Sequence, residues 1–239
     1  MTGRLAVMGG GAFALVGLTI ALGLGLPPTA EQGEYARLIA VHPPIAWVAY
    51  VAFGVMALAS LLYLAPATRH PRWDRIAAAS AELGVVFTAL MLVTGSIWGR
   101  PTWGVWWTWD ARLTISALML ALLAGYGALR RMTPEPERRA RVCAVAALAA
   151  VVVVPVNHYA VTWWRTLHQG RSLAQVDPGS DVDGSYVGVM LLGFVAMTLV
   201  YAWLLAVRVR VEEAEDARSA DLVADAIAER RREGALAGQ

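Results

Sequence analysis

Six long apolar segments, separated by short polar or arginine-rich stretches, dominate the pattern of hydrophobic and polar positions along the chain. Most of them approach the roughly 20 residues that cross a bilayer as an α-helix rising about 1.5 Å per residue. The segments cover residues 5–26, 43–65, 76–97, 113–129, 142–161 and 186–207. The pattern therefore predicts an all-α, polytopic integral membrane protein with six transmembrane helices.

The first apolar segment has two interpretations, a cleaved signal peptide or a membrane anchor. Its apolar run is too long for a signal peptide, its flanking charge is Arg4, and no convincing small-residue cleavage site follows it. We therefore expect it to stay in the protein as a membrane anchor.

Composition supports a membrane protein and excludes two kinds of chemistry. The chain is 58% hydrophobic and 16% charged over 239 residues, which is too apolar for the surface of a soluble domain of this size. The single cysteine, Cys143, is expected to be a small buried residue. The sequence has no Cys-x-x-Cys-His motif for covalent haem and no Gly-x-x-x-x-Gly-Lys-Ser/Thr loop for ATP.

Arginines are concentrated in alternate loops, which sets the expected orientation. Loops 66–75 and 130–141 and the start of the tail are rich in Arg, whereas loops 27–40, 98–112 and 162–185 hold few for their length. By the positive-inside rule the arginine-rich loops and both termini are cytoplasmic. The three other loops then emerge together on the outer side.

Two regions follow from this arrangement. Residues 1–207 form a six-helix membrane domain that carries the tryptophan-rich loop 98–112, and residues 208–239 form a charged cytoplasmic tail. The tail alternates acids and arginines with a few apolar residues, which is typical of a solvated amphipathic helix. It either docks a partner or stays unpartnered, and the sequence favours neither.

Five of the ten tryptophans fall within residues 98–109, in the outer loop between the third and fourth segments. A loop so short and so rich in indole cannot bury its rings in a core of its own. The rings must cover lipid at the interface or a planar hydrophobic ligand. A further pair, Trp163 and Trp164, lies on the same side and favours a ligand platform over a simple aromatic belt.

Three of the four histidines, His42, His158 and His168, lie on the same outer side, and His70 lies on the opposite one. A single histidine at a membrane edge usually caps a helix or forms an interfacial hydrogen bond. Two neutral imidazoles that approach an aromatic surface from separate helix ends could instead supply axial ligands to haem iron.

Charged residues near the outer loops could serve the same ligand. The two haem propionates need cationic or hydrogen-bonding partners, and four outer arginines are available: Arg100, Arg112, Arg165 and Arg171. Their alternative role is to snorkel to the interface. Asp110 directly precedes the fourth segment and is expected to be its N-cap.

The run Trp103-Gly-Val-Trp106-Trp107-Thr-Trp109-Asp110-Ala-Arg112-Leu-Thr resembles the tryptophan-rich WWD signature of haem-handling proteins in cytochrome c biogenesis. Together with the six segments, His42 and the element Trp-Trp-x-Thr-Leu-His168-Gln-Gly, it makes the chain similar to the haem exporter protein C family. That family supplies the C subunit of the bacterial System I maturation complex. The resemblance covers roughly residues 35–205.

The resemblance implies a protein that binds non-covalent haem b at the periplasmic face of the inner membrane and delivers it to a periplasmic haem chaperone, the E component. It implies no enzymatic activity. The family's two axial histidines fall on His42 and His168, and its tryptophan-rich site falls on Trp103, Trp106, Trp107, Trp109 and Asp110, with Arg112 beside it. His158 is left as a structural or supporting residue.

The resemblance also implies partners in the membrane. These are an ABC-type ATPase and a permease (the A and B components), a small single-span subunit (the D component) and the lipid bilayer, and no nucleic acid is expected. One departure concerns His42, since Pro43 follows it directly where the family is expected to place one residue between them. Proline biases the preceding residue toward an extended backbone, which affects the aim of the His42 ring.

Two other functions fit the residues. A b-type cytochrome would carry electrons between quinol and an outer acceptor, but such proteins normally ligate haem from histidines deep inside their helices. A permease subunit would move haem or another lipid-like solute, with the tryptophans only anchoring it. It would keep its flux after the outer histidines were replaced.

Overall fold

In a computed structural model, residues 2–168 and 184–237 are described, and within these ranges the only strand-like pairing is a single bridge between Thr29 and Gly33. The expected all-α class is therefore confirmed. The helices are α1 (Thr2–Leu24), the 3₁₀ helix η1 (Glu34–Ala40), α2 (His42–Leu64), α3 (Pro71–Trp103), α4 (Ala111–Met132), α5 (Pro136–Ala150), α6 (Val153–Trp163) and α7 (Gly184–Ala237).

Six helical segments of the described part are long and apolar enough to cross a membrane, which confirms the multi-pass architecture. The structure corrects the predicted end of the third helix. The tryptophan-rich segment was expected to be a loop from residue 98, but α3 continues to Trp103 and leaves only residues 104–110 non-helical. Gly104, at φ 78°, takes the left-handed conformation that ends the helix.

The fifth apolar segment is two helices rather than the single helix expected over residues 142–161. A turn at Val151 and Val152 separates α5 from α6. Pro155 explains the break, because it has no N–H to donate to the carbonyl of Val151 four residues earlier. Instead, the backbone N–H of Val154 bonds that carbonyl at 3.0 Å in a tight turn.

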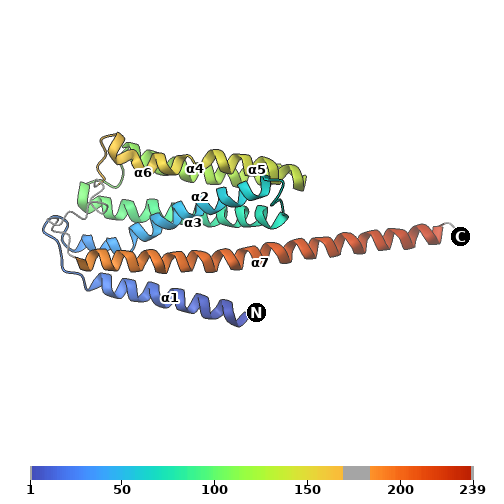
Figure 1. The fold of residues 1–239 in the computed structure, drawn as a ribbon, viewed down its shortest axis with the longest axis horizontal. Coiled ribbons are helices and arrows are strands. Elements are labelled where there is room, and N and C mark those ends of the chain that lie inside the picture. Colours follow the sequence, from blue (N-terminus) through green and yellow to red (C-terminus); the bar gives the residue numbers. More distant parts are fainter. Residues whose placement is uncertain (1, 169–183, 238–239) are drawn as a thin grey trace.

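Figure 1 shows the membrane helices lying along one direction, with the chain termini toward the same end of the molecule. The opposite end gathers the C-terminus of α1, the start of α7 and the ends of α3 and α6. The described helix ends that flank the three loops poor in arginine therefore lie together (Figure 1), as the six-segment pattern predicts. We call this the outer end.

Helix α2 lies at the centre of the bundle, because its side chains contact neighbours on several sides. Val48, Ala52, Phe53 and Met56 are completely buried. Small residues bring the helices close, as is usual in membrane bundles. A Cβ added to Gly84 of α3 would lie 3.1 Å from the Leu123 side chain of α4.

Ion pairs join the helices at the arginine-rich end. Arg130 of α4 binds Asp74 of α3 through both guanidinium nitrogens, at 2.6 and 3.0 Å, and both side chains are largely buried. Glu82, an acid near this end of α3, pairs with Arg208 of α7 at 2.5 Å. The first pair joins α4 to α3, and the second attaches α7 to the bundle.

The arginine-rich end also includes the charged tail, Cys143 and His70. The tail is helical as expected, but it continues α7 without a break instead of forming a separate helix. Cys143 is fully buried, which confirms its assignment as a core residue. His70 caps α3, since its Nδ1 accepts from the backbone N–H of Arg72 at 3.2 Å.

Candidate functional site

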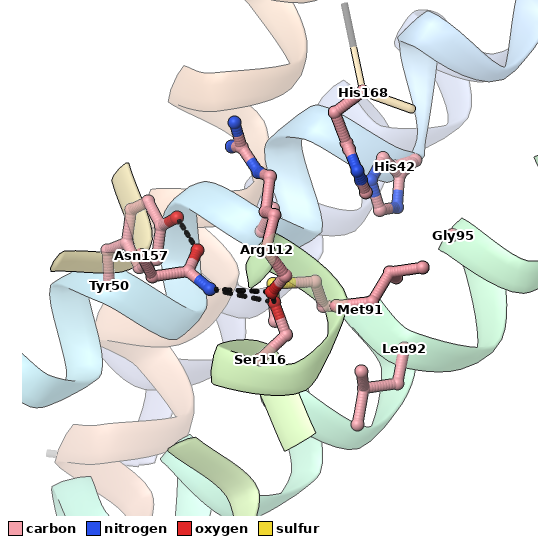
Figure 2. A pocket seen from close by; sticks show the side chains of 11 residues that line it. His42, Tyr50, Met91, Leu92, Gly95, Arg112, Ser116, Asn157 and His168 are labelled. Atoms are coloured by element: carbon pink, nitrogen blue, oxygen red, sulfur yellow. Dashed lines mark hydrogen bonds between the residues drawn. The ribbon is translucent and has the colours of Figure 1, made fainter. Parts of the chain in front are cut away.

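A cavity of about 50 Å³ opens at the outer end between α2, α3, α4 and α6. This volume is below the range of about 300–1,000 Å³ that is usual for small-molecule sites, so a large ligand would lie across the mouth of the cavity rather than inside it. Figure 2 shows the imidazoles of His42 and His168 next to each other on one side and the pair Tyr50 and Asn157 on the other, with Arg112 between them. The remaining lining residues are Ala46, Met91, Leu92, Gly95, Leu113 and Ser116.

His42 is the first residue of α2, although Pro43 was expected to favour an extended backbone before it. The proline sits in the first turn, where its missing N–H costs no helical hydrogen bond. The His42 ring contacts α3: Nδ1 lies 3.0 Å from Thr94 Oγ1, and the ring meets Trp98 edge-on at 5.7 Å between centroids. Helix α3 thus fixes the imidazole.

His168 enters the same pocket from the segment that follows α6. Its ring meets Trp103 at 4.9 Å between centroids, and its Nδ1 lies 3.8 Å from Asp110 Oδ2, which is too long for a hydrogen bond. Burial and then the nearby Arg112 guanidinium lower the pKa of His168 to about 4, against the opposing effect of Asp110. The imidazole is therefore neutral near pH 7, as a metal ligand requires.

Asp110 connects two elements of the site. Its Oδ1 accepts from the backbone N–H of Leu113 at 2.8 Å, so the expected N-cap of α4 is confirmed. Its Oδ2 accepts from the backbone N–H of Leu167 at 3.1 Å. The same carboxylate therefore starts α4 and anchors the residue next to His168.

A buried polar cluster supports the inner side of the pocket. The amide of Asn157, which is 1% exposed, donates to the Arg112 carbonyl at 3.0 Å and to Ser116 Oγ at 2.9 Å. Its oxygen accepts from the Tyr50 hydroxyl at 2.5 Å. These bonds tie α2, α4 and α6 together (Figure 2).

The tryptophans divide into two groups. Trp98 and Trp103, on the last turns of α3, contact the two pocket histidines. Trp106, Trp107 and Trp109 do not line the cavity. Trp107 packs edge-on against Trp109 at 5.4 Å, while Trp106 and Trp109 are 60% and 78% exposed. These three residues, which we call the aromatic rim, lie in the segment between Trp103 and Asp110 and are not part of the cavity wall.

The other predicted residues lie away from the cavity. His158 is exposed on α6 and its ring contacts those of Tyr50 and Tyr159. Arg100 donates to the carbonyl of Gly104, and Arg165 is exposed. Arg171 lies outside the described residues. Of the four outer arginines, Arg112 is the one that lines the pocket.

Several residues in or next to the pocket were not predicted, although sequence features of some of them could have indicated a role. Asn157 is a polar residue inside an apolar segment, which usually marks a functional or structural contact in a membrane. Thr94 and Trp98 are four residues apart and so share a face of α3. Tyr50 had no such signal, because only the packing of α2 against α6 brings it to Asn157.

The polar side chains of the pocket suit a metal ion whose coordination positions are mostly filled by a bound macrocycle. No group of three or more metal-binding side chains occurs in the described ranges, so a bare ion would be poorly held there. Two imidazoles, an arginine and apolar walls match iron porphyrin, whose ring nitrogens fill four positions. The buried Nδ1 of His168 also has no hydrogen-bond partner among the described residues.

Comparison with known proteins identifies related sequences. Residues 2–224 match the family described as Heme exporter protein C. A protein of that name from Bradyrhizobium diazoefficiens is 40% identical over 178 residues, covering 74% of this chain and 66% of its own length. One from Haemophilus influenzae is 37% identical over 199 residues, covering 83% and 80%. A mitochondrial protein from Marchantia polymorpha, named for cytochrome c biosynthesis, is 36% identical over 162 residues, covering 67% and 68%.

Proposed function

Because the chain belongs to the Heme exporter protein C family, we propose that it binds haem during c-type cytochrome maturation and passes it to a periplasmic haem chaperone. Haem is the cargo of this protein and not a resident cofactor of an enzyme. The site faces the periplasm from the bacterial inner membrane, and both termini are cytoplasmic.

One observation carries the proposal. Two imidazoles from separate elements, His42 at the start of α2 and His168 beyond the end of α6, line one cavity at the outer end of the bundle. Each imidazole would offer one nitrogen to the iron of haem. Arg112 in the same cavity offers a cation to a propionate.

The surroundings suit a cargo that is received and released. Both histidines lie at helix ends, where a ligand can enter and leave without passing through the core of the bundle. The rim of Trp106, Trp107 and Trp109 offers aromatic surface to the exposed edge of haem or to a partner that takes it. An electron carrier would instead keep its haem deep between the helices.

The bound species is haem b. Cys143, the only cysteine, is buried far along α5 from the cavity, so the site holds no thiol that could bond a vinyl group. We assign the remaining parts of the pathway to partners: an ABC-type ATPase and permease, a small single-span subunit and the haem chaperone. The chain itself has no phosphate-binding loop for ATP.

Replacement of single histidines tests the site. His42→Ala and His168→Ala should each lower the haem content of the purified protein at least about 10-fold, because each removes an iron ligand. The measurement is the haem-to-protein ratio from the pyridine hemochrome spectrum, together with haem transfer to the chaperone.

His70→Ala is the control, since His70 caps α3 at the opposite end of the bundle. It should leave the haem content unchanged. Equal losses in all three variants would contradict the site assignment, and continued haem flux without either outer histidine would favour a permease.

The aromatic rim is tested separately. Trp106→Ala combined with Trp107→Ala should weaken haem binding or chaperone docking several-fold, because both belong to the segment whose ends, Trp103 and Asp110, lie near His168, and membrane insertion should stay intact. Quantification of the variant in membrane fractions and a chaperone pull-down measure the two effects. Loss of the protein from the membrane would show that these rings serve only as an anchor.

A further inference from the structure

Thr94 of α3 lies directly beside the His42 ring, and its single hydroxyl proton has three possible acceptors. Its Oγ1 is 2.8 Å from the carbonyl of Leu90, one turn earlier in α3, and the Met91 carbonyl is farther away at 3.4 Å. The second close contact is with His42 Nδ1 at 3.0 Å. A carbonyl can only accept, so the contact with Leu90 requires Thr94 to donate its proton there. The other contact then requires His42 Nδ1 to be the donor.

The rest of the His42 surroundings on α3 hold the ring in this position. A Cβ on Gly95 would lie 3.0 Å from Cε1 of the imidazole, so the glycine leaves the space that the ring occupies. Trp98, four residues after Thr94, meets the ring edge-on with an interplanar angle of 81°. Thr94, Gly95 and Trp98 together form a cradle on one face of α3.

We propose that Thr94 is a positioning residue that holds the proton of His42 on Nδ1 and leaves the lone pair on Nε2 for haem iron. This inference rests on the proposed function of the pocket. Histidines that ligate metals generally donate their second ring N–H to a fixed acceptor, and loss of that acceptor typically costs about 10- to 100-fold in affinity. Here a threonine hydroxyl supplies the acceptor from within a membrane helix.

Thr94→Val tests the proposal, because valine keeps the shape of the side chain and removes the acceptor. Purified full-length protein is titrated with ferric haem, and affinity and the absorption spectrum are recorded. We expect haem affinity to fall about 10-fold or more. We also expect the low-spin spectrum of a two-imidazole site to shift toward high spin. Thr94→Ser keeps a hydroxyl and should restore both properties.

Thr198 offers a matched control on α7. Its hydroxyl also donates to a carbonyl four residues earlier, that of Phe194, and accepts a ring N–H from α2, that of Trp47, at 3.0 Å. Thr198→Val therefore removes the same pair of bonds away from the pocket and should leave the haem spectrum unchanged.

The outcomes separate the two proposals. Three results would overturn the role of Thr94 alone. The first is a Thr94→Val protein with wild-type affinity and a low-spin spectrum, and the second is a Thr94→Ser protein as defective as the valine variant. The third is an equal loss of haem affinity in Thr198→Val. A wild-type protein that binds no haem, or whose binding is unaffected by His42→Ala, would overturn the proposed function and the role of Thr94 together.

Discussion

At the scale of single residues, the two pocket histidines are held in different ways. His42 is fixed by a hydrogen bond and by close packing on α3. His168 has no hydrogen bond on Nδ1 within the described part of the chain, and a carboxylate stands 3.8 Å from that nitrogen. The charge of Asp110 favours the tautomer that keeps the proton on Nδ1, although the distance is too long for a direct bond.

Asp110 has two separable roles, and two substitutions distinguish them. Asp110→Ala should lower the free energy of unfolding by about 1 kcal/mol because α4 loses its N-cap. Asp110→Asn keeps an oxygen that can cap α4 but loses the charge near His168 and the second acceptor, which binds the Leu167 N–H, so it should lower haem affinity with a smaller effect on stability. Thermal unfolding in detergent and haem titration measure the two effects. Identical behaviour of both variants would contradict this division.

At the scale of helices, the outer end depends on how α4 and α6 are aligned. Asn157 performs this alignment, since it bonds the backbone of α4 at Arg112 and the hydroxyl of Tyr50 on α2. The bonds are buried, and a buried polar group that loses its partner is costly in a membrane as in a protein core.

Asn157→Ala should therefore lower the free energy of unfolding by about 1–2 kcal/mol, because it removes the acceptor of the Tyr50 hydroxyl and both bonds that join α6 to α4. Haem affinity should also fall, as Arg112 lines the cavity. Unfolding of the purified protein in detergent measures the first effect. Ser60→Ala is the matched control, since Ser60 Oγ is buried with no hydrogen-bond partner among the described residues, and it should be close to neutral. A neutral Asn157→Ala would show that the cluster does not hold the helices together.

At the scale of the whole molecule, the distribution of arginines and the packing of the helices distinguish the same two ends of the bundle. The pocket lies at the end whose loops are poor in arginine, and the ion pair of Arg130 with Asp74 lies at the other. Orientation in the membrane follows if the arginine-rich end is cytoplasmic.

Cysteine labelling tests that orientation. In a Cys143→Ala background, Arg165→Cys places a thiol at the exposed outer end and Arg72→Cys places one at the exposed opposite end. A membrane-impermeant maleimide should label the first in intact spheroplasts and the second only after permeabilisation, because the reagent cannot cross the bilayer. The reverse pattern would place the pocket in the cytoplasm.

The sequence by itself determined the architecture, because membrane helices need long apolar runs and their loops carry a charge bias that is readable residue by residue. It also determined the N-cap at Asp110, since a cap acts within one turn of its own helix. The helical end of the tryptophan-rich segment at Trp103 was not determined this way, because the helix-ending signal at Gly104 competes with Pro101 and Gly99 before it.

Only the tertiary structure decided which side chains share the pocket. Residues as distant along the chain as His42, Met91 and Asn157 line one cavity through the rotation of each helix about its axis, which depends on packing against all its neighbours at once. For the same reason, Arg112 lines the cavity whereas Arg100 and Arg165 do not, although all three occur in similar outer segments. Apolar patterns fix how far a helix extends through the membrane, and only side-chain packing fixes the direction in which it faces.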